Sequence, residues 1–325
     1  MTNAPFEAAT PAEDGPRPLI TVAICTRNRA AFLEAAIRSV LPQIHDDTEV
    51  LIVDNASTDQ TAVVTRQFTA SHPQVRYYYE QNLGTSFARS SAIRNARGRY
   101  VLFLDDDSTA DEGWLAAYQR FLGTPPSPRI ALVAGGCFPR YEVPPPAWIG
   151  PQENTLDMGD KAYRLNRQDS PYEGNSAYAR EPAMQHGLFD PRLGHVGAKP
   201  GFHEGSDLNL RLQDAGYELW WLPGAGVQHT IHASRLNLRW YCRAAFSIGT
   251  SAALKRLKFA RGPGARVAMR LGRLATAPFH FLANIVVFLV LYPCTKKVTA
   301  VKALRRAMRG AGYAWQLLNP QPEIA

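Results

Sequence analysis

The chain has 325 residues, of which 46% are hydrophobic and 20% are charged, so it can form one large or two small globular domains with a buried core. Its cysteines, Cys25, Cys137, Cys242 and Cys294, form no CxxC pair. This spacing excludes a closely spaced zinc site and a compact disulfide framework, and it favours a reducing compartment. No signal peptide opens the sequence, and residues 1–18 are expected to form a flexible arm.

The net charge of +8 hides two regions of opposite sign. Residues 1–218 hold 20 Lys and Arg against 27 Asp and Glu, whereas residues 219–325 hold 16 Lys and Arg against one acid, Glu323. An asymmetry of this kind indicates that the basic part faces phosphates, either of nucleic acid or of anionic lipid.

Strand and helix patterns alternate along the first two thirds of the chain. Near-continuous apolar runs separated by amphipathic helices predict an α/β fold, with a mostly parallel sheet and helices on both faces. Pro-rich connectors fill much of 123–172. The predicted strands cover 19–25, 49–55, 75–80, 99–105, 130–136 and 217–223, and the predicted helices cover 30–43, 59–70, 85–96 and 206–216.

Polar clusters follow three of these strands, at 26–29 (TRNR), 54–61 (DNASTDQT) and 105–108 (DDDS). Ligands of open α/β sheets bind beyond the carboxyl ends of the strands, so the three clusters predict one site. Three adjacent carboxylates directly after a buried strand repel one another, which indicates a bound cation more than a solvated acidic turn. The phosphate-binding loops GxxxxGK[ST] and GxGxxG are absent from the sequence.

Residues 275–294 contain no formal charge when His280 is neutral, and twenty residues are about enough to span a bilayer. Two prolines, His280 and Asn284 weaken this segment, and basic helical patterns flank it. The pattern predicts a helix that lies in or dips into an anionic membrane surface, in preference to a true span. The alternative is a core helix of a C-terminal bundle.

Five motifs occur in a characteristic order between Leu19 and His229. They read TVAICTRNR, LIVDNASTDQT, NLGTSFARSSAIRNARGRYVLFLDDD, YEGNSAYAR and HEGSDLNLRLQDAGYELWWLPGAGVQH. In this order they resemble the family 2 glycosyltransferases, which have the Rossmann-like GT-A fold and use nucleotide-activated sugars. The resemblance implies a GT-A domain over 19–235, divided into a nucleotide-binding half (19–122) and an acceptor-binding half (123–235), before a basic helical region at 236–325.

The resemblance also implies a donor site. Asp54 would accept a hydrogen bond from the base, usually uracil N3–H, although an Asx turn or a helix N-cap would also explain this residue. Arg89 would lie near the diphosphate, unless it only forms a salt bridge. The residues implied to bind the nucleotide sugar are Thr26, Arg29, Asp54, Asn82, Gly84, Arg89, Asp105 and Asp106.

Asp105 and Asp107 match the DXD motif of the family. The resemblance implies that Asp107 ligates a divalent metal, Mn²⁺ or Mg²⁺, and that Asp105 contacts the ribose, the sugar or the metal. His229 matches a histidine that contacts the metal or the diphosphate. A surface histidine is the alternative, and His232 could take the same role.

The acceptor side departs from the family pattern. Inverting members use a carboxylate base, and HEGSDLNLRL has Gly205 where a second acid commonly stands. The base is therefore Glu204 or Asp207, with Glu204 favoured because Asp207 could merely cap a helix. The residues implied to contact the acceptor are Asn175 and Trp221, although one of the two adjacent tryptophans is expected in the core.

These features predict an inverting, metal-dependent transfer of sugar from a nucleotide-diphosphate sugar, with a UDP-sugar favoured. The acceptor is expected to be a glycan or a lipid-linked molecule of cell-surface polysaccharide or glycolipid biosynthesis. The protein is expected in the cytoplasm, peripheral or monotopic at the cytoplasmic face of the membrane. The alternatives are a catalytically inactive sugar-nucleotide-binding scaffold and a nucleic-acid-binding protein. The second is disfavoured because the basic region interleaves few aromatic residues.

Overall fold

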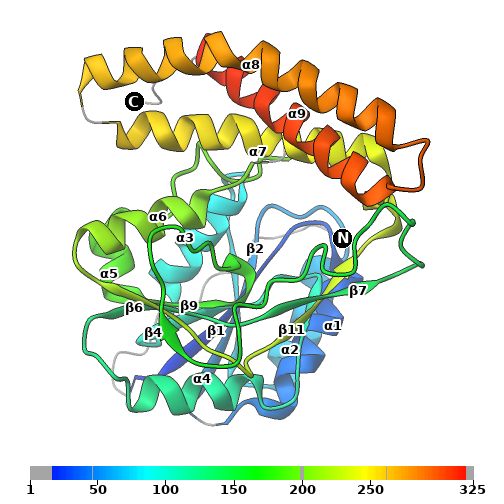
Figure 1. The fold of residues 1–325 in the computed structure, drawn as a ribbon. Helices are drawn as coiled ribbons and strands as arrows, with labels where there is room; N and C mark the ends of the chain where they lie inside the picture. Colours follow the sequence, from blue (N-terminus) through cyan, green and yellow to red (C-terminus); the bar gives the residue numbers. More distant parts are fainter. Residues whose placement is uncertain (1–16, 46, 198–200, 261, 320–325) are drawn as a thin grey trace. The chain divides into compact units, whose positions relative to one another are not determined.

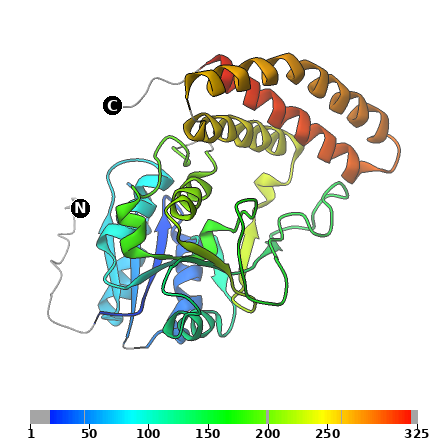
Figure 2. The same ribbon diagram turned by 60° about the vertical axis from the view of Figure 1, so that its left-hand side comes forward.

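The computed structural model describes residues 17–45, 47–197, 201–260 and 262–319, so most of the expected N-terminal arm lies outside the described residues. The chain divides into two compact units, which Figures 1 and 2 draw from two directions. We call them the sheet unit (Met1–Arg140, Asn154–Pro191 and Gly205–Thr230) and the helical unit (Tyr141–Glu153, Arg192–Glu204 and Ile231–Ala325).

An eight-stranded sheet forms the centre of the sheet unit. Six of its strands run parallel to one another, while β9 and β8 run antiparallel to their neighbours. The strand order is β3 (Val75–Tyr79), β2 (Thr48–Asp54), β1 (Ile20–Thr26), β4 (Tyr100–Phe103), β9 (Ser176–Ala179), β6 (Ile130–Ala134), β10 (Glu218–Trp221) and β8 (Tyr163–Arg164). A second sheet has the order β5 (Ser108–Ala110), β11 (Val227–Ile231) and β7 (Cys137–Tyr141).

Helices cover both faces of the large sheet, which confirms the predicted fold class (Figure 1). Because parallel crossovers are right-handed, the next helix moves to the opposite face when the chain returns after β3 to add β4 on the other side of β1. One face carries α1 (Ala30–Val40), α2 (Thr61–Ser71) and α4 (Trp114–Gly123). The other carries α3 (Thr85–Asn95), α5 (Arg180–Gln185) and α6 (Glu204–Asp214).

The burial of individual elements explains their sequence patterns. All seven residues of β2 are buried, as expected of a strand covered on both faces. The apolar stripe of α1 is buried at Leu33, Ala36, Ile37 and Val40, and Pro42 stands in the 3-10 turn (Leu41–Gln43) that ends this helix.

Several elements differ from the sequence prediction, among them α2 and β9. The helix expected from residue 59 begins at Thr61, after the N-cap Gln60, and the Asp59 carboxylate accepts a hydrogen bond from the backbone N–H of Thr61 (3.0 Å). Strand β9 was not predicted. Its four residues are all buried, so they carry neither an alternating pattern nor enough length to be recognised.

Three long helices dominate the helical unit: α7 (Leu238–Phe259), α8 (Pro263–Leu291) and α9 (Lys297–Leu318). Helix α9 packs against both of the others. Two glycines bring α7 and α9 close together, because a Cβ atom at Gly249 would lie 2.0 Å from the Arg309 carbonyl oxygen, and one at Gly312 would lie 2.0 Å from that of Phe246. Small residues at these two positions therefore allow the backbones to approach.

Helix α8 keeps an apolar side exposed. Among the described residues, Arg266–Leu291 is the one helical segment that is long and apolar enough to cross a membrane by length and composition, and none of its most apolar window is buried. Its most exposed apolar side chains are those of Val267, Leu271, Phe279, Leu282, Val286, Leu289 and Val290. The alternative of a core helix is therefore not supported for α8 within the helical unit.

Candidate active site

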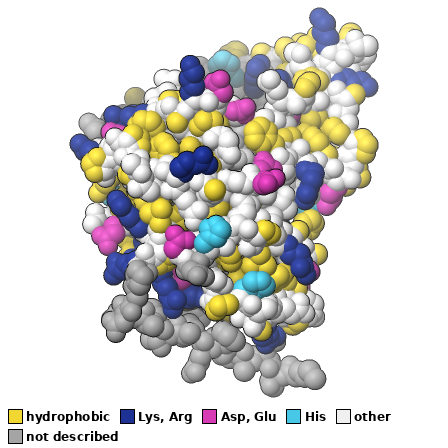
Figure 3. Space-filling view, turned by 90° about the horizontal axis from the view of Figure 1, so that it is seen from below, with side chains coloured by type: hydrophobic (Ala, Val, Ile, Leu, Met, Phe, Trp, Pro, Cys, Tyr) yellow, Lys and Arg dark blue, Asp and Glu magenta, His cyan; other side chains and the backbone are white. Residues whose placement is uncertain are grey.

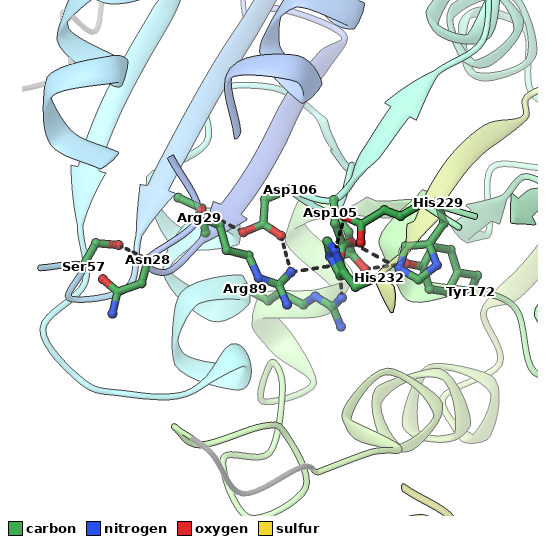
Figure 4. A network of polar contacts seen from close by, with 12 residues as sticks. Asn28, Arg29, Ser57, Arg89, Asp105, Asp106, Tyr172, His229 and His232 are labelled. Carbon is green, nitrogen blue, oxygen red and sulfur yellow. Dashed lines mark hydrogen bonds and ion pairs between the residues drawn. The ribbon is translucent and has the colours of Figure 1, made fainter. Parts of the chain in front are cut away.

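The candidate site lies at the carboxyl ends of the central parallel strands. The register pairs Thr26 at the end of β1 with Asp54 at the end of β2, and Asp54 with Tyr79 at the end of β3. Because β4 ends at Phe103 beside β1, the run Asp105–Asp107 follows at the same edge. The sheet therefore brings the three predicted polar clusters together, as Figure 4 shows for residues from the first, second and fourth strand ends.

Asp105 lies between an arginine and a tyrosine. Its Oδ1 accepts a hydrogen bond from the Arg89 guanidinium (3.0 Å), and its Oδ2 accepts one from the Tyr172 hydroxyl (2.6 Å). Arg89 is buried, and its guanidinium also lies 5.9 Å from the centre of the Phe103 ring. Burial, together with the charge of Asp105, raises the pKa of Tyr172 well above its usual value, so this hydroxyl stays protonated and donates.

Asp106 and Asp107 share Arg29. The Arg29 Nη1 lies 2.8 Å from Asp106 Oδ1 and 2.9 Å from Asp107 Oδ2. Asp106 also accepts a hydrogen bond from the Thr26 hydroxyl (2.7 Å), and Asp107 Oδ1 lies 3.2 Å from His229 Nε2. Burial raises the pKa of Asp106 to about 6 even though Arg29 lowers it. Arg29 therefore offsets only part of the cost of burying Asp106 beside Asp107.

The Asp54 side chain is buried, and both of its carboxylate oxygens accept hydrogen bonds. Its Oδ2 accepts a hydrogen bond from the Tyr77 hydroxyl (2.8 Å) and its Oδ1 one from the backbone N–H of Ser57 (2.9 Å). The second bond is the Asx-type turn that the sequence left open as an alternative. Each carboxylate oxygen has a further lone pair, so a base-binding role for Asp54 stays a prediction.

The loops after β1 and β2 are joined by hydrogen bonds that the sequence analysis did not anticipate. The Asn28 backbone N–H donates to the Ser57 hydroxyl (2.9 Å), and Asn28 Oδ1 accepts from the Thr58 N–H (2.7 Å). Asn28 has a positive φ of 53°, which asparagine tolerates better than most residues. These contacts fix the position of Arg29, the next residue, and Figure 4 shows the pair Asn28 and Ser57 beside it.

Asn82 and Gly84 are held by two side chains that were not predicted. Glu80 Oε1 accepts from the backbone N–H (2.7 Å) and the side-chain amide (2.9 Å) of Asn82. Asn55 donates to the Asn82 carbonyl (2.6 Å) and accepts from the Gly84 N–H (2.8 Å). Gly84 has a φ of 143°, which favours glycine. Asn55 stood in the quoted motif after β2, so its position at a strand end was an available signal.

The donor atoms that could hold a metal are those of Asp105, Asp107 and His229. Asp107 and His229 already meet, and the Asp105 side chain is 29% exposed. No group of three or more such side chains close enough to hold an ion is found among the described residues. The residues fit a cation that takes only part of its ligands from protein, because Mg²⁺ and similar ions keep positions for phosphate and water oxygens.

On the acceptor side, α6 begins at Glu204, which is buried. Asp207 is fully buried, and its Oδ2 accepts from the Arg211 guanidinium (2.7 Å), one helical turn on. Arg211 also donates to the carbonyl oxygens of His186 and Leu188 beyond the end of α5. Asp207 is thus tied to a bond network that holds α6, and the choice between Glu204 and Asp207 as the base stays a prediction.

The two predicted acceptor-binding residues lie in the interior. Asn175 accepts from the indole of Trp114 (2.7 Å) and donates to the carbonyl oxygens of Gly136 and Ala225. Trp221 is 1% exposed and donates to a backbone carbonyl. A side chain in the core cannot contact a bound sugar without leaving the core. Neither Asn175 nor Trp221 is therefore placed to bind the acceptor.

His232 was the alternative to His229. It belongs to the helical unit, where its Nδ1 lies 2.9 Å from Glu142 Oε1. In the sheet unit, His229 meets Asp107 and lies against the Tyr172 ring, with the two ring centres 5.8 Å apart. The structure therefore favours His229 of the two histidines. Tyr172 is the first residue of the quoted motif YEGNSAYAR, but no residue pattern indicated its contact with Asp105.

Comparisons with known proteins agree with this geometry. The family model described as glycosyl transferase family 2 matches residues 21–171. A Bacillus subtilis glycosyltransferase named for teichuronic acid biosynthesis is 38% identical over 92 residues, which are 28% of this chain and 36% of the relative. A Campylobacter jejuni β-1,3-glucosyltransferase named for a polyprenyl-diphosphate-linked glycan is 32% identical over 101 residues, 30% of this chain and 33% of the relative. The matched part thus spans about a third of these relatives.

Solved structures agree in fold. A mannosyltransferase from Pyrobaculum calidifontis, crystallised with GDP-Man and Mn²⁺, has a TM-score of 0.59 at 19% identity and covers 98% of this chain and 92% of its own. S. aureus TarS 1-349, in complex with UDP-GlcNAc, has a TM-score of 0.52 at 15% identity and covers 88% and 90%. Residues 21–171 of the chain therefore match the model of glycosyl transferase family 2, and the sheet unit has the GT-A fold.

Proposed function

We propose that the chain is an inverting glycosyltransferase that uses a nucleotide-diphosphate sugar and a divalent metal. The observation that carries this proposal is the meeting of Asp107 with Arg29 and His229 at the carboxyl ends of the strands. The proposal is supported by relatives named as glycosyltransferases and by neighbours crystallised with GDP-Man or UDP-GlcNAc. A UDP-sugar is favoured because Asp54 offers the acceptor that uracil N3–H requires.

The donor would bind across the three strand ends. Arg29, whose side chain is 35% exposed, can turn its guanidinium from Asp106 and Asp107 to the diphosphate. Asp107, His229 and Asp105 would hold the metal. When bound, the metal neutralises the charge on the diphosphate leaving group. The buried pair of Arg89 and Tyr172 fixes the Asp105 carboxylate, and the Asn28–Ser57 contact fixes the loop that carries Arg29.

A carboxylate at the start of α6 would take the proton of the acceptor hydroxyl. The acceptor oxygen forms a bond to the anomeric carbon, the bond to the diphosphate oxygen breaks, and its electron pair leaves with the nucleoside diphosphate. We assign the base to Glu204, because the Asp207 carboxylate forms an ion pair with Arg211. Attack from the face opposite to the leaving group inverts the anomeric centre.

The acceptor is proposed to be a glycan or a lipid-linked sugar, with the chain held at the cytoplasmic face of a membrane. This rests on α8, whose apolar side is exposed and whose first turns carry Arg266, Arg270 and Arg273. Basic residues beside an apolar helix face favour an anionic lipid surface. On the face of the described residues in Figure 3, Lys and Arg are interspersed with Asp and Glu.

The test is a panel of UDP-sugars and GDP-mannose with octyl glycosides and polyprenyl-diphosphate-linked sugars as acceptors, with and without Mn²⁺. We expect transfer with one donor, inversion in the NMR coupling of the product, and UDP binding that needs Mn²⁺ in titration calorimetry. UDP binding without any transfer would favour the inactive scaffold. No UDP binding in either condition would contradict the donor site itself.

The base assignment has its own test. Glu204→Gln should lower kcat at least 100-fold, because positioned proton transfer contributes on the order of 10²–10⁴-fold, while UDP affinity stays unchanged. Asp207→Asn should instead lower the thermal midpoint, because Arg211 loses its charged partner. Glu181→Gln, on exposed α5, is the matched control. A folded Asp207→Asn protein without activity, together with an active Glu204→Gln protein, would move the base to Asp207.

A further inference from the structure

Gly205 stands in the first turn of α6, and its backbone does not require glycine. Its φ lies outside the left-handed region that other residues avoid. Glycine inside a helix costs about 0.5–1 kcal/mol relative to alanine, so an ordinary side chain would stabilise α6 if it fitted. The side chains around residue 205 therefore offer a structural reason for glycine at this position.

The space beside Gly205 is filled by Glu173. A Cβ atom at residue 205 would lie 1.9 Å from Glu173 Cγ and 2.5 Å from Glu173 Oε1. These distances are far below any real contact, so a side chain at 205 and the present Glu173 conformation exclude each other. A carboxylate from a different segment of the sheet unit therefore stands beside the start of α6, where a carboxylate on residue 205 would begin.

The backbone on both sides of Glu173 is fixed against Asp105. Tyr172 donates to Asp105 Oδ2, and the backbone N–H of Asp105 donates to the Gly174 carbonyl (3.2 Å). Gly174 approaches Asp105 so closely that a Cβ atom there would lie 2.3 Å from Oδ2. The next residue, Asn175, is buried and anchored in the core. Glu173 is thus placed with little freedom between the acidic run and α6.

We propose that Glu173 supplies the second carboxylate of the acceptor site and binds an acceptor hydroxyl beside the base Glu204. This inference rests on the proposed function and deepens it, because it adds a residue that recognises the acceptor. Glu173 is half-buried, so part of its side chain is exposed and can contact a bound molecule. A carboxylate accepts hydrogen bonds from sugar hydroxyls and leaves the donor contacts at the strand ends unchanged.

The proposal predicts that the carboxylate can be moved from one segment to the other. Glu173→Ala should raise the KM for an octyl glycoside acceptor at least 10-fold, with donor KM and Mn²⁺-dependent UDP affinity within 2-fold of the wild type. The double variant Glu173→Ala with Gly205→Asp should regain acceptor KM to within about 5-fold, because the carboxylate returns from α6 into the vacated space. Gly205→Asp alone should lower the thermal midpoint, because the new side chain meets Glu173.

The matched control is Glu173→Ala with Gly205→Asn, which fills the same space with an uncharged side chain and should not regain acceptor KM. If this control recovers as well as the aspartate variant, Glu173 acts by filling volume and the proposal is overturned. An unchanged acceptor KM in the Glu173→Ala variant also overturns the proposal about Glu173. If the wild type transfers sugar in the same assay, the proposed function is not affected by that result. If Glu173→Ala does not fold, Glu173→Gln keeps the volume, and an acceptor KM raised less than 2-fold contradicts the proposal. A wild-type chain without transfer from any donor removes both proposals.

Discussion

The sheet unit and the helical unit differ in the groups that they bury and in the groups that they expose. The sheet unit holds 18 Lys and Arg against 24 Asp and Glu, and it buries charged groups such as Asp106, Asp107 and Arg89 as paired ions. The helical unit holds 18 Lys and Arg against 4 Asp and Glu, and it leaves apolar side chains of α8 exposed. Buried charge requires internal partners, whereas exposed apolar surface favours an external one. This difference is consistent with the donor site that we propose in the sheet unit and with the docking role that we propose for α8.

The largest expected effect concerns the exposed side of α8. Phe279, Leu282, Val286 and Leu289 lie on one helical stripe, and replacing all four with Gln should lower binding to anionic vesicles at least 100-fold in flotation. Each of these side chains contributes about 1.5–3 kcal/mol when it is fully buried in an apolar environment. Val63→Gln, at an exposed position of α2, is the control. If vesicle flotation is unchanged, α8 docks on something other than lipid, and the helical unit does not provide a membrane-binding surface.

A smaller effect is expected from the interior of the sheet unit. Asn175→Ala would leave the Trp114 indole and the Ala225 carbonyl short of a partner, whereas the Tyr118 hydroxyl keeps its bond to the backbone carbonyl of residue 175. Unsatisfied buried groups cost about 1–3 kcal/mol each, so we expect a loss of about 3–5 kcal/mol in the free energy of unfolding by urea. The exposed Asn166→Ala should change it by less than about 0.5 kcal/mol. Equal stability of both variants would mean that water replaces these bonds.

The smallest expected effect is a pH dependence within the helical unit. Burial, with Lys255 and Arg309 nearby, lowers the pKa of His203 from 6.5 to about 4. Between these values the unfolded chain binds the proton and the folded chain does not, so stability is lost as pH falls from about 6.5 to 4. His203 has a φ of 77°, which Asn tolerates, so His203→Asn should flatten the midpoint of urea unfolding over this range. An unchanged slope would place the acid sensitivity elsewhere.

The fold was largely predictable from the sequence, because its buried parallel strands are continuous apolar runs and its helices carry a regular stripe. The edge that collects Thr26, Asp54 and Asp105–Asp107 followed from the rule that parallel strands end together. Strand β9 was missed, since four buried residues contain no period. The placement of Asn175 and Trp221 was also not predictable, because polar and aromatic residues occur in cores and at sites alike.

The sequence by itself determined the family resemblance, the position of the acidic run and the division into an acidic and a basic region. Only the tertiary structure decided which cations pair with each of the three carboxylates, and that Asp207 pairs with Arg211. Only the tertiary structure placed Glu173 in the space beside Gly205, 32 residues away in the chain. Local patterns report what neighbouring residues impose on the backbone, whereas a side chain's partners come from segments that the fold brings together.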